Sequence, residues 1–152
     1  MINVLINGSQ GSMGKVLKKC IDKTSDISVR YEIDKDTPLS FETLTLNSDK
    51  PDVIIDFSTP EASFIALDYA VCHLVPIVIA TTGFSDDGNS KISEYSQAIP
   101  IFKASNMSYT IHLIGKTLTD ISPFLSYMDI EILEKHHNRK KDSPSRYCSF
   151  SC

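Results

Sequence analysis

The residues best suited to chemistry lie at positions 134–145, which read Glu-Lys-His-His-Asn-Arg-Lys-Lys-Asp-Ser-Pro-Ser. Two adjacent histidines, His136 and His137, stand here among four cations. The cations would form an electropositive pocket for an acidic substrate, and a histidine that titrates near neutral pH can deliver a proton as a hydride arrives. A solvated basic loop is the alternative, and the segment alone does not separate the two. A metal site is disfavoured, because neighbouring residues of a strand point to opposite faces and no third ligand follows at a familiar spacing.

A glycine-rich turn at residues 8–14 offers a second kind of chemistry. It follows an apolar run at residues 2–7 and opens a helical pattern. In such a turn the first glycine permits the tight bend, the helix N-terminus offers free N–H groups to a pyrophosphate, and the last glycine lets helix and strand pack closely. The sequence therefore predicts a dinucleotide site at Gly8, Ser9, Gln10, Gly11, Ser12, Met13 and Gly14. Gln10 is expected to crowd the position of the usual middle glycine, and a turn that merely connects strand to helix is the alternative.

An acidic residue stands at the end of the second predicted strand. Asp34 follows Gly14 by twenty residues, where dinucleotide folds place a carboxylate that accepts hydrogen bonds from the adenine-ribose hydroxyls. The neighbouring Lys35 could tolerate the 2′-phosphate of NADP. The pair predicts that either NADH or NADPH serves as the cofactor.

The elements that must position these residues alternate along the chain. Strand patterns at residues 2–7, 27–33, 53–57, 76–80 and 100–103 are separated by helical patterns. The first helix is expected to bury one face, made of Met13, Val16, Leu17, Cys20 and Ile21. This alternation predicts an α/β fold with a Rossmann-like, doubly wound parallel sheet and right-handed crossovers.

A second domain is expected to begin after residue 105. A helix at 106–118 and a strand at 128–133 lead into the histidine segment. We therefore divide the chain into a dinucleotide-binding domain, residues 1–105, and a partial substrate-binding domain, residues 106–152.

Composition excludes several other classes of protein. The chain has 152 residues and a formal net charge of −4, which disfavours a general nucleic-acid binder, and no aromatic residue interleaves the cations of residues 135–141. The four cysteines form no CxxC pair, so neither a zinc site nor a disulfide framework is predicted. No apolar run approaches the roughly 20 residues that span a bilayer, and no basic leader precedes the first strand. The expected compartment is the cytoplasm.

Several motifs taken together resemble one enzyme family, 4-hydroxy-tetrahydrodipicolinate reductase, also called dihydrodipicolinate reductase. They occur in the order of the family and cover residues 1–145: the glycine turn, Asp34, Asp-Phe-Ser-Thr-Pro at 56–60, Ala-Thr-Thr-Gly-Phe at 80–84, Ser-Asn-Met-Ser at 105–108 and the histidine segment. The resemblance implies reduction of 4-hydroxy-tetrahydrodipicolinate to tetrahydrodipicolinate with NAD(P)H, in lysine and diaminopimelate biosynthesis.

The resemblance also implies roles for single residues. His136 matches the proton donor, Lys140 the cation that steadies the substrate's developing charge, and His137 a contact to a substrate carboxylate. Thr81, Thr82 and Gly83 match the loop near the nicotinamide, and Asn106 and Met107 the segment that links the two domains.

The chain departs from the family pattern after Ser145. Arg146 and Tyr147 stand where family members have Gly-Thr, and the family chain continues through the rest of an α+β substrate domain that builds a homotetramer. The departure predicts a truncated or frameshifted product with an incomplete substrate domain, monomeric or poorly assembled. An inactive fragment or a non-catalytic nucleotide-binding protein is therefore the alternative to a working reductase.

Overall fold

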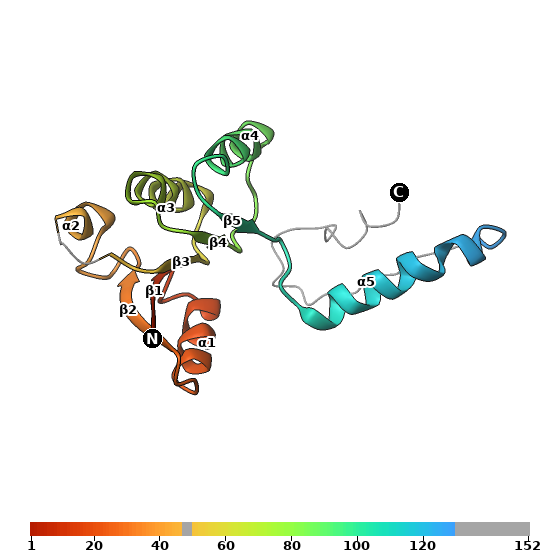
Figure 1. The fold of residues 1–152 in the computed structure, drawn as a ribbon, viewed down its shortest axis with the longest axis horizontal. Helices are drawn as coiled ribbons and strands as arrows, with labels where there is room; N and C mark the ends of the chain where they lie inside the picture. Colours follow the sequence, from red (N-terminus) through yellow and green to blue (C-terminus); the bar gives the residue numbers. More distant parts are fainter. Residues whose placement is uncertain (47–49, 130–152) are drawn as a thin grey trace. The chain divides into compact units, whose positions relative to one another are not determined.

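The computed structural model describes residues 1–46 and 50–129, and the chain divides into two compact units, residues 1–105 (unit 1) and 106–152 (unit 2). Figure 1 shows the ribbon of both units with their helices and strands labelled. The dinucleotide-binding and substrate-binding roles assigned to these ranges stay predictions.

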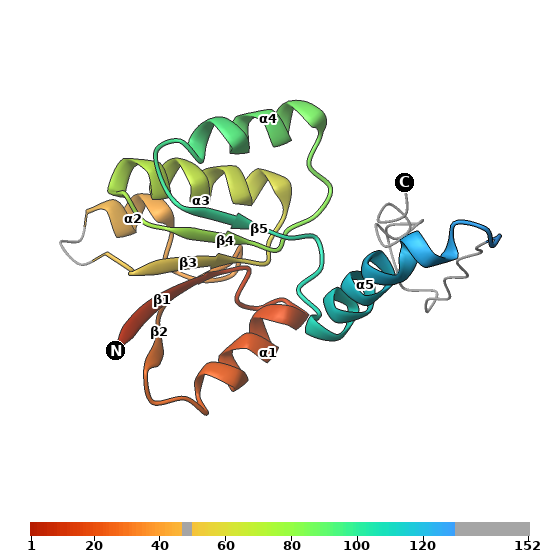
Figure 2. The same ribbon diagram turned by 45° about the vertical axis from the view of Figure 1, so that its right-hand side comes forward.

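Unit 1 is built on one parallel sheet of five strands, in the order β2-β1-β3-β4-β5. The strands are β1 (Ile2–Asn7), β2 (Ile27–Ile33), β3 (Val53–Asp56), β4 (Ile77–Ile79) and β5 (Ile101–Lys103). Figure 2 shows them running in the same direction. The predicted strand positions and the parallel sheet are confirmed.

Helices cover both faces of this sheet. The helices of unit 1 are α1 (Ser12–Ile21), α2 (Phe41–Thr45), α3 (Pro60–His73) and α4 (Asp86–Tyr95). In both ribbon views α1 lies on one face, and α2, α3 and α4 lie on the other. This arrangement confirms the doubly wound, Rossmann-like fold.

The side-chain alternation of the strands supplies a core to each face. Along β1, Val4 and Ile6 pack with Ile21 of α1, while Leu5 points into the opposite core with Leu67 of α3. Successive strand residues point to opposite faces, so one short apolar run serves both helix layers. Leu67 is fully buried, which stabilises unit 1 by about 1.5–3 kcal/mol relative to an exposed leucine.

The predicted buried face of α1 is wrong in most of its members. Met13 and Val16 are each about half exposed, and Cys20 is exposed as well. The residues of α1 that are buried are Gly14 and Ile21, with Leu17 packed against the core beside them. Gly14 lies close against the backbone of Gly8 and Ser9 in the glycine turn, whereas Leu17 and Ile21 pack against the core.

The helix α2 lies in a stretch where the sequence shows only scattered apolar residues. Ser40 accepts a hydrogen bond from the Thr43 N–H at 3.2 Å, and the Thr43 hydroxyl accepts one from the Ser40 N–H at 3.0 Å. This reciprocal capping starts the helix and places Phe41 and Leu44 in the core.

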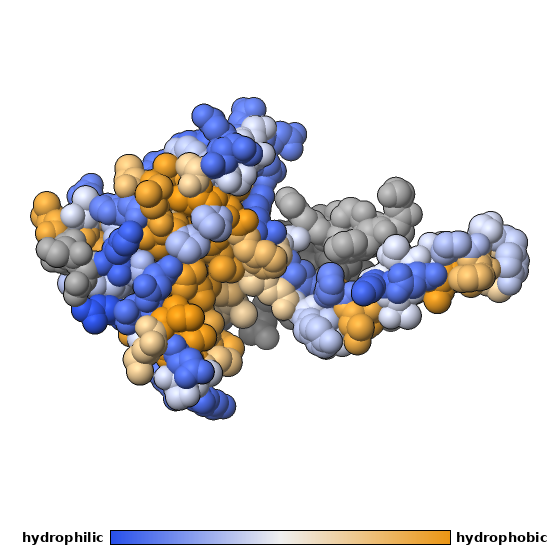
Figure 3. All heavy atoms as spheres, in the orientation of Figure 1, coloured by the Kyte–Doolittle hydropathy of each residue, from blue (hydrophilic) through white to orange (hydrophobic). Residues whose placement is uncertain are grey.

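Unit 2 contains α5 (Tyr109–Ile121) and the 3₁₀-helix η1 (Ser122–Leu125). The helix starts three residues later than predicted, because Ser108 is its N-cap and accepts from the Ile111 N–H at 3.4 Å, and it ends three residues later than predicted, at Ile121. None of its residues is buried, and Figure 3 shows apolar residues along it in orange. Of the strand predicted at 128–133, residues 130–133 lie outside the described residues, and Met128 and Asp129 are not in a strand.

Candidate functional site at the carboxyl ends of the strands

The sheet has a topological switch point at β1, because the chain adds β2 on one side of this strand and β3, β4 and β5 on the other. β1 lies beside both β2 and β3, and the chain leaves β1 towards α1 on one face but leaves β3 towards α3 on the other. Open parallel sheets bind ligands at the carboxyl ends of the strands at such a switch point. The glycine turn after β1, the loop after β3 and the loop after β4 all lie at this edge.

The glycine turn is packed so closely that two of its glycines cannot carry a side chain. Gly8 has φ +82°, and a Cβ there would lie 2.4 Å from the carbonyl oxygen of Phe57. A Cβ on Gly14 would lie 2.3 Å from the carbonyl oxygen of Gly8. Gln10 is exposed and its φ is not positive, so the turn does not need a glycine there for its backbone conformation.

The N-terminus of α1 differs from those of the other described α-helices. Ser40, Thr59, Ser85 and Ser108 cap α2, α3, α4 and α5 with a side-chain oxygen. Gly11 is the N-cap of α1 and supplies no side-chain cap, and the first turn of α1 has no acidic residue. Its first N–H groups thus keep their donor capacity and the helix dipole is not neutralised, which fits a bound pyrophosphate.

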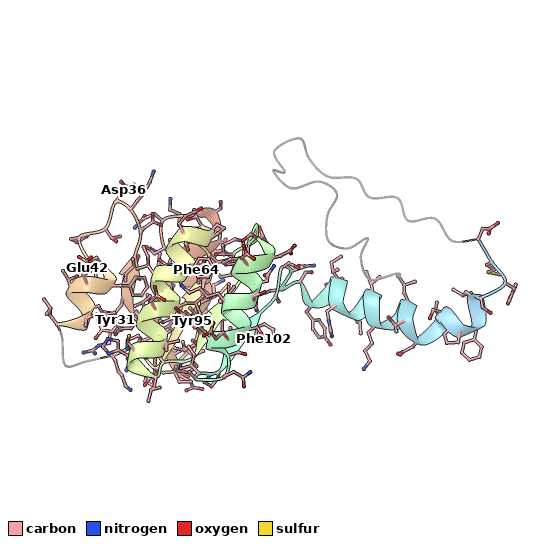
Figure 4. The ribbon with its side chains drawn as sticks, turned by 90° about the horizontal axis from the view of Figure 1, so that it is seen from above. Tyr31, Asp36, Glu42, Phe64, Tyr95 and Phe102 are labelled. Atoms are coloured by element: carbon pink, nitrogen blue, oxygen red, sulfur yellow. The ribbon has the colours of Figure 1, made fainter. Side chains whose placement is uncertain are left out.

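Asp34 lies next to the glycine turn. Its Oδ2 accepts a hydrogen bond from the Gln10 N–H at 2.9 Å, and its Oδ1 accepts one from the Lys35 N–H at 2.8 Å. Each oxygen keeps a lone pair for a further donor such as a ribose hydroxyl. The Lys35 side chain is 84% exposed, and its Nζ lies 3.9 Å from Asp36 Oδ2. Figure 4 shows Asp36 at the periphery of the unit.

Ser9 is fully buried, and its Oγ has no hydrogen-bond partner among the residues the structure describes. Ser12 and Met13 form the exposed first turn of α1. All seven predicted residues of the turn therefore belong to one compact loop-to-helix junction beside Asp34.

A buried carboxylate stands at the centre of the carboxyl edge of the sheet. The sequence prediction did not include it among the site residues. Asp56 ends β3 and is fully buried. Its Oδ1 accepts from Asn7 Nδ2 at 2.8 Å and from the Ser58 hydroxyl at 2.5 Å. Its Oδ2 accepts from the Thr81 hydroxyl at 2.8 Å and from the Ser63 hydroxyl. An acidic residue closing an apolar strand is the sequence signal that marks this position.

The loop after β4 contains both buried and exposed residues. Thr81 is buried, with its hydroxyl turned to Asp56, whereas Thr82 and Gly83 are exposed. Gly83 has φ +90°, a conformation that favours glycine. Phe84 anchors the loop, because it is buried and its ring makes an edge-on contact with Phe64 at 5.6 Å between centroids.

The remaining predicted residues lie elsewhere. Asn106 and Met107 begin unit 2, where Asn106 Oδ1 accepts from the Ser108 N–H at 2.9 Å. His136, His137 and Lys140 lie outside the described residues. Within the described part of the chain, no group of three or more histidine, cysteine or acidic side chains could hold a metal ion, and no helix is long and apolar enough to cross a membrane.

Comparison with known proteins supplies independent information. Residues 2–107 match the family model described as dihydrodipicolinate reductase, N-terminus. The 4-hydroxy-tetrahydrodipicolinate reductases of Clostridium novyi (strain NT) and Rickettsia rickettsii (strain Sheila Smith) are 41% and 36% identical over 151 and 146 residues, and both alignments cover 95% of this chain. Each covers 60% of the relative, so the chain spans about three-fifths of the length of these curated relatives.

A solved structure is similar as well. Dipicolinate-bound dihydrodipicolinate reductase from Paenisporosarcina sp. TG-14 matches with a TM-score of 0.77 and 27% sequence identity. The match covers 98% of this chain and 63% of that one.

Proposed function

Because this chain belongs to the dihydrodipicolinate reductase family, we propose that unit 1 binds NADH or NADPH at the carboxyl ends of β1, β3 and β4. The observation that carries the proposal is the uncapped N-terminus of α1, which follows the glycine turn at the switch point of the sheet. Its N–H groups would hold the pyrophosphate, and the oxygens of Asp34 would accept from the adenine ribose. The exposed Thr82 and Gly83 would face the nicotinamide half.

The same site is proposed to accept both dinucleotides. Asp34 favours NADH, because its carboxylate can accept from free ribose hydroxyls but repels a 2′-phosphate. Lys35 offsets this repulsion, since its exposed ammonium is only loosely paired with Asp36 and can turn to a phosphate. We therefore expect the affinities for NADH and NADPH to agree within about tenfold, roughly 1.4 kcal/mol.

The reaction we propose is the reduction of 4-hydroxy-tetrahydrodipicolinate, the compound in the names of the relatives. The bound dinucleotide would supply the hydride, and the 4-hydroxyl group would leave as water to give tetrahydrodipicolinate. His136 would deliver a proton to the substrate, Lys140 would stabilise the charge that develops on it, and His137 would contact a carboxylate. A cation and a proton donor suit a dicarboxylate that gains electron density as it is reduced.

The binding proposal is tested at Ser12, the first residue of α1. Ser12→Glu places a negative charge where the pyrophosphate would lie, yet an acidic residue in a first turn stabilises the helix. We expect NADH fluorescence titration to give a micromolar Kd for the original chain, about 8 kcal/mol, and a Kd at least tenfold weaker for Ser12→Glu without a lower melting temperature. Ser12→Gln has nearly the same size without the charge and should bind within threefold of the original.

Two results would contradict the binding proposal. One is the absence of a saturable signal with either dinucleotide. The other is an unchanged Kd in Ser12→Glu, which would show that the pyrophosphate does not bind at the N-terminus of α1.

The activity is tested separately, by following oxidation of NADH or NADPH in the presence of the dicarboxylate substrate. Turnover that is lost in His136→Gln and in Lys140→Ala, while dinucleotide affinity is kept, would support the assigned roles. Binding without turnover in the original chain would leave a nucleotide-binding protein and reject the reductase reaction for this chain.

A further inference from the structure

We propose that Asp56 is the positioning residue of the carboxyl edge, which holds the loops after β3 and β4 in the arrangement that receives the dinucleotide. This inference rests on the proposed function and deepens it. Asp56 ends the central strand β3, between β1 and β4, and is fully buried.

The hydrogen-bonding capacity of the carboxylate is fully used. An ionised carboxylate only accepts hydrogen bonds and offers about four lone-pair sites. Asp56 receives four donors, two on each oxygen, and all of them come from uncharged side chains. These donors belong to β1, the loop after β3, α3 and the loop after β4, so one side chain connects the elements on both sides of the switch point.

Neighbouring donors fix the direction in which the Thr81 and Ser58 hydroxyls donate. The Thr81 hydroxyl accepts from the Ser58 N–H at 3.0 Å, so its own proton points to Asp56 Oδ2 at 2.8 Å. The Ser58 hydroxyl receives Asn7 Nδ2 at 3.0 Å and donates to Asp56 Oδ1. A polar chain therefore runs from the backbone of the β3 loop through Thr81 to the carboxylate.

This chain of bonds changes the role expected of Thr81. Its hydroxyl is engaged inside the protein as both donor and acceptor, and its side chain is buried. Thr81 is therefore a second positioning residue, acting with Asp56. The contact to the dinucleotide falls to Thr82 and Gly83, which Thr81 holds at the surface of the edge.

Ser63 provides a matched control. Its hydroxyl donates to Oδ2, the same carboxylate oxygen that Thr81 contacts, but it is a fully buried residue within α3 and carries no loop of the edge. Ser63→Ala and Thr81→Val each delete one hydrogen bond to this oxygen. A carboxylate that only stabilises the fold would respond alike to both changes, whereas a positioning carboxylate would not.

The experiment compares Thr81→Val, Thr81→Ser, Ser63→Ala and Asp56→Asn in the full chain with two readouts. The first is the Kd for NADH. The second is the hydrogen-exchange rate of the Ser58 amide, measured by NMR without any dinucleotide. We expect Thr81→Val and Asp56→Asn to weaken NADH binding about tenfold and to speed exchange of the Ser58 amide at least tenfold, because the N–H loses its anchored acceptor. If Asp56→Asn does not fold, Thr81→Val carries the test.

The controls make the outcome decisive. Thr81→Ser keeps the hydroxyl and should show the same NADH Kd and the same Ser58 amide exchange rate as the original chain. Ser63→Ala should lower the melting temperature but leave the NADH Kd within twofold of the original value. Equal losses of affinity in Ser63→Ala and Thr81→Val, or an unchanged Ser58 amide in Thr81→Val, would overturn the inference. If the original chain binds no dinucleotide, the proposed function fails, and the exchange rates still decide whether Asp56 positions this edge.

Discussion

Leu74 adopts a backbone conformation that suits glycine better than leucine. It is the C-cap of α3 with φ 54° and ψ 44°, and the residue is 68% exposed. A left-handed residue with a Cβ is strained by roughly 1–2 kcal/mol, and the side chain of an exposed leucine makes few packing contacts that could offset this strain. We expect Leu74→Gly to raise the free energy of unfolding by about 1 kcal/mol, measured by urea denaturation. Leu74→Ala, which keeps a Cβ, should gain nothing, and equal stability of the two variants would contradict the strain.

Gly14 shows the opposite case, in which an added methyl group has no room. A Cβ would lie 2.3 Å from Gly8 O and 2.8 Å from the backbone of Ser9, so the turn itself must move. We expect Gly14→Ala to lower the free energy of unfolding by about 3 kcal/mol or more, as overpacking against backbone does, and to weaken NADH binding in parallel.

Gly11 is the control for this change, because it lies in the same turn but is exposed. Its Cβ would lie 3.3 Å from Gly8 O, a contact that a shift of a few tenths of an ångström relieves. Urea denaturation of Gly11→Ala should show a loss of no more than about 1 kcal/mol. Equal losses of unfolding free energy in Gly11→Ala and Gly14→Ala would show that the close approach of α1 to the turn does not exclude a side chain at position 14.

At the scale of elements, α3 and α4 are joined by a polar contact on their outer surface. The Tyr95 hydroxyl donates to Asp68 Oδ1 at 2.5 Å, and Lys91 Nζ lies 5.2 Å from the centre of the Tyr95 ring. Figure 4 shows Phe64 and Tyr95 on these two helices. The hydrogen bond to Asp68 raises the pKa of Tyr95, because that bond needs the protonated phenol.

This contact predicts a pH-dependent contribution to stability. Because the folded-state pKa of Tyr95 exceeds the unfolded value of about 10, the contribution is fully present below pH ~10 and is lost as the pH rises through the folded pKa. Tyr95→Phe should cost at most about 1 kcal/mol at pH 7, since water competes at this exposed site, and should reduce the loss of stability above pH ~10. Urea denaturation from pH 7 to 11 measures both effects.

Tyr95→Phe should still lose some stability at alkaline pH. Burial also raises the pKa of Tyr69, which lies on α3 with its ring beside that of Phe41. An identical stability–pH curve for Tyr95→Phe and the original chain would show that the contact between α3 and α4 does not contribute.

At the scale of the whole molecule, the core of unit 1 is self-contained. Both core clusters consist of residues between Val4 and Ile101, and the five strands are complete within residues 1–105. We therefore expect a fragment of residues 1–105 to unfold cooperatively, with a urea midpoint close to that of unit 1 in the full chain.

A fragment of residues 1–108 tests the predicted cofactor residues Asn106 and Met107. It should have the same urea midpoint as fragment 1–105 but bind NADH more tightly, because it retains these two residues. Equal Kd values for the two fragments would remove Asn106 and Met107 from the cofactor site.

Local patterns in the sequence were sufficient for the five strands of unit 1, for most of its helices and for the glycine turn, but not for α2. Apolar runs located the strands, and the glycines at 8, 11 and 14 marked the turn. Each of these signals lies within a few residues, where backbone conformation and capping are decided. The family was recognisable for the same reason, since its motifs are short and ordered along the chain. The roles of His136, His137 and Lys140 stay predictions.

The tertiary structure alone decided which distant residues meet. Asn7 and Thr81 lie 49 and 25 residues from Asp56, and they reach it only because β3 pairs with both β1 and β4. Strand order cannot be read from periodicity, because every strand of a buried parallel sheet has the same apolar pattern. The narrow contact face of α1 and the inward turn of Thr81 depend on the same non-local packing. The sequence thus predicted the kind of site, and the sheet topology decided which distant side chains meet at the carboxyl ends of the strands.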